Sequence, residues 1–180
     1  AHTLNIATGH ALDVFLWCFG EMRNVLSSIT TQVSEWESEE PVNKVPVTSP
    51  DNVAFVGHLE NGAVISVHIA AVPWHGTAFR MEAYGTNGTL TATSNQMVEM
   101  VDPIIKGGQK VDSEADVLRP PNDLQWIPNN VPPGVPVNVA QLFRRFATAI
   151  RDDEHILPDF TEAARLHHTL DQIEKSGDGL

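Results

Sequence analysis

Apolar residues recur along the chain with two periods, one typical of helices and one typical of strands. The stretch "GHALDVFLWCFGE" is almost entirely apolar or small, apart from His10, Asp13 and its final glutamate. It predicts a helix over about 10–19 that ends at Gly20 and is covered on most sides. The β-branched residues of 24–36 favour a strand, and the prolines and acids of 37–50 favour an exposed loop.

From 51 to about 102 the apolar positions alternate with polar ones. Asn-Gly pairs at Asn61-Gly62 and Asn87-Gly88 predict two hairpins, and 96–102 resembles a further strand. One side of the resulting antiparallel sheet, of about five or six strands, is apolar: Val53, Phe55, Leu59, Ile65, Val67, Ile69, Phe79, Met81, Leu90 and Ala92. The other side mixes polar and apolar residues: His58, Ser66, His68, Arg80, Glu82 and Tyr84 among Ala54, Val56 and Val64. Such a mixed face commonly meets another protein surface.

The last third of the chain predicts a long irregular segment and two helices. Residues 103–136 are rich in proline and lack a clear period. Apolar residues at helical spacing predict a helix over 137–152, and another over 160–176 with Asp159 as N-cap. The fold class is therefore α+β: an open, mainly antiparallel sheet with helices packed on one face and the other face available for oligomerisation.

Composition narrows the possible partners. The formal net charge of −12 disfavours binding to nucleic acid or to an anionic membrane, and no apolar run is long enough to span a bilayer. The single cysteine, Cys18, cannot form an internal disulfide, which favours a reducing, cytoplasmic compartment. Because the chain opens with Ala1-His2-Thr3 rather than methionine, we expect a fragment of a longer protein.

His10 and Asp13 are the first candidates for chemistry. They lie one helical turn apart, so the carboxylate could orient an imidazole that carries protons near neutral pH. The alternative is a core histidine satisfied by a nearby acid. Trp74 and His75, between the two hairpins, could line a pocket for a sugar or polyol, or form a plain loop. The histidines lack metal-ligand spacing, and no GxGxxG loop joins a strand to a helix, so we predict neither a metal site nor dinucleotide binding by this chain alone.

Four stretches, taken in order, resemble one known family. "GHALDVFLWCFGE", "LENGAVISVHI", "YGTNGTL" and "PDFTEAARLHHTLDQIEKS" are similar to the C-terminal domain of the Gfo/Idh/MocA oxidoreductases, and more closely to the branch of the yeast galactose-pathway repressor. The similarity spans nearly all of residues 1–180, which would form one substrate-binding and oligomerisation domain. The N-terminal Rossmann domain, which binds NAD or NADP in this family, is absent from the chain.

The resemblance implies roles for particular residues. In the family, the histidine at the position of His10 takes the substrate's hydroxyl proton as hydride leaves for the nicotinamide, beside a lysine from the Rossmann domain. Asn5, Asp13, Trp74 and His75 would shape the pocket. The family often has an aspartate four residues before the histidine, where this chain has Ile6. This departure suits a branch that includes a non-catalytic repressor.

Three hypotheses follow for the function. The first is the substrate-binding and self-associating half of an NAD(P)-dependent oxidoreductase for a sugar or polyol, inactive without its cofactor domain. The second is a ligand-sensing regulatory domain without catalysis. The third is a purely structural dimerisation module. Dimers or tetramers would form through the mixed face of the sheet.

Overall fold

The computed structural model describes residues 3–37, 44–71, 75–76, 78–98, 100–128 and 130–177. The chain divides into two compact units. Unit 1 comprises Ala1–Trp74 and Pro158–Leu180, and unit 2 comprises His75–Leu157. Together they contain helices and antiparallel strands, which confirms the α+β class.

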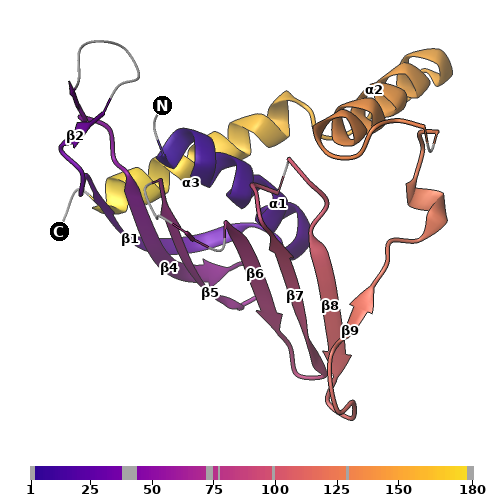
Figure 1. Cartoon of the computed structure of the whole chain (residues 1–180), viewed down its shortest axis with the longest axis horizontal. Helices are drawn as coiled ribbons and strands as arrows, with labels where there is room; N and C mark the ends of the chain where they lie inside the picture. The colour runs from indigo at the N-terminus through magenta and orange to yellow at the C-terminus, as the bar shows by residue number, and fades with distance from the viewer. Residues whose placement is uncertain are drawn as a thin grey trace. The chain divides into compact units, whose positions relative to one another are not determined.

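Unit 1 is a small antiparallel sheet with helices on one face (Figure 1). Its sheet has the strand order β1-β4-β5. The elements of this unit are the π-helical turn η1 (Leu4–Thr8), α1 (Gly9–Phe19), β1 (Met22–Thr30), β2 (Glu35–Trp36), β3 (Val45–Pro46), β4 (Asn52–Leu59), β5 (Val64–Ala70) and α3 (Phe160–Gly177). The short strands β2 and β3 pair only with each other.

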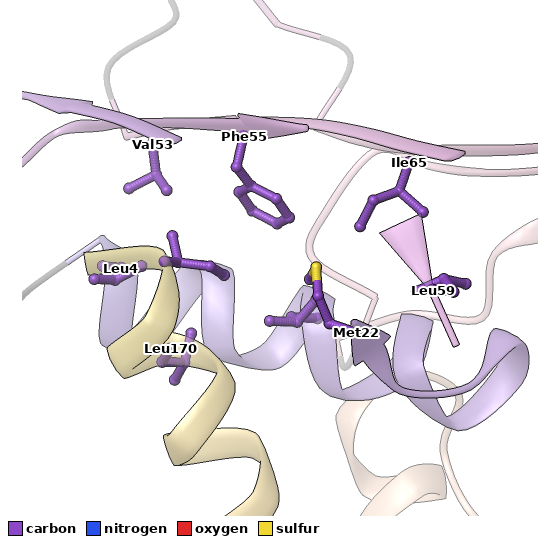
Figure 2. Close-up of a cluster of buried hydrophobic side chains, with 9 residues drawn as sticks. Leu4, Met22, Val53, Phe55, Leu59, Ile65 and Leu170 are labelled. Carbon is purple, nitrogen blue, oxygen red and sulfur yellow. The ribbon is translucent and has the colours of Figure 1, made fainter. Parts of the chain in front are cut away.

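The core of unit 1 lies between the sheet and the helices α1 and α3. Figure 2 shows Val53, Phe55 and Ile65 pointing from the strands toward Leu4 and Leu170 of the helical layer. These side chains are buried, as the alternation of apolar residues predicts. Packing of this kind supplies most of the stability of such a layer.

Polar groups fix α3 to β1 beneath this core. The hydroxyl of Ser27, which is buried on the inner face of β1, donates to the carbonyl of Ile173. The hydroxyl of Ser176 donates to the carbonyl of Val25 (3.1 Å) and accepts from the amide of Ser27 (3.2 Å). The two elements are far apart in sequence, so these bonds hold the last helix in register with the first strand.

Local signals explain where these elements begin and turn. Gly62 adopts φ +87° in the β4–β5 hairpin, a conformation that glycine tolerates without strain. The carboxylate of Asp159 accepts hydrogen bonds from the amides of Thr161 (2.7 Å) and Glu162 (3.1 Å). Asp159 therefore caps α3, as the sequence predicts.

Unit 2 contains a second antiparallel sheet, with the strand order β6-β7-β8-β9. Its elements are β6 (Phe79–Tyr84), β7 (Gly88–Ser94), β8 (Ile104–Gln109), β9 (Asp116–Leu118), the 3-10 turn η2 (Asn122–Leu124) and α2 (Val135–Asp152). On one face of β6, the Arg80 guanidinium lies 2.6 Å from the Glu82 carboxylate. This hydrogen bond, followed by the smaller one from Tyr84, holds the pKa of Glu82 below its ordinary value, although desolvation raises it.

The structure corrects several sequence expectations. The strand expected over 24–36 is divided into β1 and β2, because the chain leaves the sheet after Thr30. The described residues of 96–102 form turns and bends rather than a strand, and β8 and β9 lie instead within the segment expected to be irregular. The strands pair in separate sheets. Thus the hairpins, with their Asn-Gly signals, are located correctly, whereas the strand that lacks such a signal is not.

The outer face of the unit 1 sheet carries no Asp, Glu, Lys or Arg among its described residues. The cross-strand register aligns Leu26 with Val56 and Ser66, in the middle of the face. We define the outer face as Asn24, Leu26, Ser28, Thr30, Asn52, Ala54, Val56, His58, Val64, Ser66, His68 and Ala70. Its imidazoles are held by amide oxygens, at 3.0 Å for His58 with Asn24 and 3.2 Å for His68 with Asn52. The face mixes polar and apolar residues, as the sequence predicts, but Arg80, Glu82 and Tyr84, which were expected on the same face, belong to the separate sheet of unit 2.

Candidate functional site

Helix α1 has a buried side and an exposed side. Leu12 is buried, and Phe15, Leu16 and Phe19 pack against the core. A second set of residues, at successive spacings of four, three and four, lies on the opposite side. These residues form what we call the α1 stripe: Ile6, His10, Asp13 and Trp17. All of them are exposed, Trp17 by 61% of its surface.

This exposure overturns the expectation that the first helix is covered on most sides. The high apolar content of α1 suggested a helix buried all round, yet Trp17 and Cys18 face outward. The sheet and α3 can cover only one side of α1 in the described residues. A composition rule could not tell a buried helix from a helix with an uncovered apolar side.

A π-helical turn precedes His10. In η1 the amide of Thr8 donates to the carbonyl of Thr3 at 2.9 Å, so this backbone bond spans five residues rather than four. Such wide turns are rare and are often found at functional sites. Asn5 lies exposed in this turn, whereas Thr8 is fully buried and its hydroxyl has no partner among the described atoms. The turn thus sets the direction from which the chain enters the helix of His10.

No hydrogen bond joins His10 to Asp13 in the described part of the chain. Both side chains are exposed one turn apart. The His10 ring is therefore available to donate a proton to, or accept one from, a molecule that approaches α1. The alternative of a buried core histidine does not agree with this placement.

The other two predicted site residues are Trp74 and His75. Trp74 lies outside the described residues. His75 is exposed, has φ +61° and belongs to unit 2, so the structure describes it apart from α1. Conversely, Trp17 was not selected from the sequence, although its spacing of seven residues from His10 places both on one helical face. That spacing was the signal that could have found it.

Two of the surface hollows formed by the described residues lie in unit 1, and neither includes the α1 stripe. One, of about 360 Å³, is lined by Thr3, Trp36, Glu37 and residues 45–51. The other, of about 350 Å³, lies on the outer face between Leu26, Val56 and His68. Neither hollow contains His10, which is exposed in the described structure of unit 1.

Asp51 lies at the edge of the first hollow but has a structural role. Its carboxylate is buried and accepts hydrogen bonds from the amides of Gln32 and Val33, each at 2.8 Å, and from the Asn52 side chain at 2.9 Å. Burial raises the pKa of Asp51, but these hydrogen bonds together lower it by more, so the pKa lies below its ordinary value. The carboxylate thereby fixes the turn that follows β1.

The described residues contain no group of three His, Cys, Asp or Glu side chains placed to hold a metal ion. Within the same residues, none of the helices combines the length and the apolar character needed to cross a membrane.

Comparison with protein families gives the affiliation of the chain. Residues 1–94, which include η1, α1 and the β4–β5 hairpin, match the family model for the C-terminal domain of Gal80p. The chain belongs to this family. Comparison with curated proteins gives no match.

Solved structures share the fold of this Gal80p-like domain at low sequence identity. A super-repressor mutant of Gal80p from Saccharomyces cerevisiae has a TM-score of 0.80 and 16% identity, covering 98% of this chain and 48% of that one. An oxidoreductase domain protein from Kribbella flavida has a TM-score of 0.79 and 19% identity, covering 98% and 49%. Levoglucosan dehydrogenase in complex with NADH and levoglucosan has a TM-score of 0.76 and 21% identity, covering 95% and 46%. The Gal80p-like chain therefore spans about half the length of these structures.

Proposed function

We propose that this chain is the substrate-binding and self-association half of an NAD(P)-dependent oxidoreductase that acts on a sugar or polyol. The observation that supports it most is the exposed imidazole of His10, which follows a π-helical turn and makes no hydrogen bond to the residues that the structure describes. The likeness in fold to a dehydrogenase solved with NADH and a sugar-derived ligand agrees with this proposal. The chain alone would be inactive, because it lacks the strand–GxGxxG–helix unit that holds a dinucleotide.

In this proposal His10 is the acid and base of the reaction. NAD or NADP, held by the other half, would accept or supply the hydride. The His10 ring would take the hydroxyl proton of the substrate during oxidation and return it during reduction. Asp13, one turn away, and Asn5, in the preceding turn, would bind or orient the substrate. Trp74 and His75 remain further candidates for the pocket.

Activity of the full-length protein tests this proposal. Purified protein containing the cofactor domain would be assayed with NAD and NADP against a panel of sugars and polyols. His10→Ala should lower kcat by about 10²- to 10⁴-fold, the usual contribution of general acid–base catalysis. His167→Ala, a change at an exposed histidine of α3, is the matched control and should keep wild-type rates. A wild-type protein that binds the dinucleotide but turns over none of the panel would contradict the proposal.

A regulatory function is the second candidate. The family match to Gal80p favours it, as does Ile6 in place of an acidic residue one turn before His10. Under this alternative, the protein would bind a ligand without turnover and control a partner protein. Affinity capture of partners with and without dinucleotide distinguishes the two, since only a regulator would change its partner in response to the ligand.

Self-association through the outer face forms the second part of the proposal. The face has exposed Leu26 and Val56 at its centre, and the described residues around them include no Asp, Glu, Lys or Arg. Because none of the outer-face residues is ionised as Asp, Glu, Lys or Arg, two copies could meet there without burying like charges. The cytoplasm remains the predicted compartment, on the basis of the single cysteine.

A further inference from the structure

Helix α2 of unit 2 has its large apolar side chains exposed. They recur at helical spacing along 135–150 and cover about 100° of the helix circumference at 3.6 residues per turn. We call these residues the α2 stripe: Val135, Val139, Leu142, Phe143, Phe146 and Ile150. Their side chains are between 44% and 67% exposed.

The polar side of α2 makes its contacts in unit 2. The Gln141 side chain accepts from the amide of Trp126 at 3.0 Å and donates to the carbonyl of Leu124 at 3.3 Å. The Arg145 guanidinium lies 5.3 Å from the centre of the Trp126 ring. Figure 1 shows the segment after β9 running to α2. The helix is thus anchored by polar residues, whereas an amphipathic helix normally turns its apolar stripe toward a core.

An exposed apolar stripe of this size indicates a surface that binds a partner. Contiguous apolar surface with two phenylalanines at its centre is a typical site of association. The solved relatives match 95% to 98% of this chain, so α2 falls within the matched region, yet they are about twice as long. The other half of such a protein is therefore the occupant best supported by length.

We propose that the α2 stripe is the docking surface for a second folded domain of the full-length protein, which meets it with an apolar patch of its own. This inference deepens the proposed function and rests on it, because that function requires a second, dinucleotide-binding half. It adds a contact in unit 2 that is separate from the α1 stripe. Docking on α2 would tie the second domain to unit 2.

Paired measurements on the full-length protein and on the 180-residue chain test the proposal. Phe143→Ser with Phe146→Ser should lower the thermal midpoint of the full-length protein by several degrees or split its transition in two. The same pair should leave the midpoint of the 180-residue chain unchanged, because the stripe is exposed there. Phe160→Ser, at a phenylalanine of α3 that is 94% exposed and outside the stripe, is the control and should change neither form.

Hydroxyl-radical footprinting gives a direct readout of the same contact. Modification of Phe143 and Phe146 should be severalfold lower in the full-length protein than in the 180-residue chain, with Phe160 modified equally in both. Equal modification of the stripe in both forms would overturn the proposal. An equal loss of stability in both forms would also overturn it, as would a gene that encodes no second half. The proposal would fail too if the double variant lowered the oligomeric mass of the 180-residue chain, or if that chain bound lipid vesicles through the stripe.

The two proposals can fail separately. Thermal midpoints and footprints need neither substrate nor cofactor. A full-length protein that fails to bind NADH would reject the oxidoreductase proposal, while protection of the stripe would still show that the second domain docks on α2.

Discussion

Asp51 shows how a single buried carboxylate can determine the path of a loop. Replacing it by asparagine removes a charged acceptor of the amide hydrogen bonds from Gln32 and Val33. We expect Asp51→Asn to lower the free energy of unfolding by about 1–3 kcal/mol, the usual cost of weakening such buried bonds. Urea denaturation at neutral pH measures the loss. Asp171→Asn, at an exposed residue of α3, should cost almost nothing.

The same carboxylate predicts a pH dependence. The pKa of Asp51 is lowered in the folded state, from an ordinary value of 3.8. Its contribution is therefore fully present above that value and is lost as pH falls through the lower pKa of the folded state. The stability difference between wild type and Asp51→Asn should be constant near neutrality and shrink in acid. A difference that grows as the pH falls would contradict this account.

At the residue scale, the sequence predicted which residues share a helical face better than it predicted whether that face is buried or exposed. His10 and Asp13 share one face of a helix, as their spacing indicated, but both are exposed on a helix that the sequence predicts to be covered on most sides. The same spacing continues to Trp17, which is also exposed. Which side of a helix is covered depends on elements that follow much later in the chain, here α3, and no local pattern carries that information.

At the scale of the elements, the pairing of β1 with β4 depends on a close backbone contact. Gly57 lies in β4 opposite Val25, where a Cβ atom would collide with the backbone carbonyl of Asn24. Gly57→Ala should therefore destabilise unit 1 by about 1–3 kcal/mol, as overpacking commonly does. Gly9→Ala in α1 is the control: the nearest side-chain atom would be 3.7 Å away, and alanine should be neutral or slightly favourable. Thermal unfolding of both variants makes the comparison.

Helices and hairpins were predicted well because their signals are local. The Asn-Gly turns and the Asp159 cap each fix a boundary within a few residues. The pairing of β8 and β9 is different, since Lys106 and Val117 are adjacent only through the sheet. The sequence did not predict these two strands, because the prolines of residues 103–136 favour an irregular segment.

On the scale of the whole molecule, the outer face gives a test of self-association. Val56→Glu would place a carboxylate at its centre in each copy, so we expect dissociation constants to rise by at least about tenfold, which corresponds to about 1.4 kcal/mol. Val111→Glu, at a residue of the β8–β9 turn that is 88% exposed, adds the same charge away from the face and should have little effect. Sedimentation over a range of concentrations would show this. A wild-type chain that stays monomeric throughout would rule out the interface.

Because the outer face carries no Asp, Glu, Lys or Arg, it also predicts how ionic strength affects self-association. The rest of the chain gives each copy a net charge of −12, so two copies repel each other before they touch. Dissolved ions screen that repulsion over distances beyond about 10 Å at 0.1 M. An interface without ion pairs has no electrostatic attraction that the same ions could weaken. Added sodium chloride would therefore draw the copies together, the reverse of its effect on assemblies joined by salt bridges.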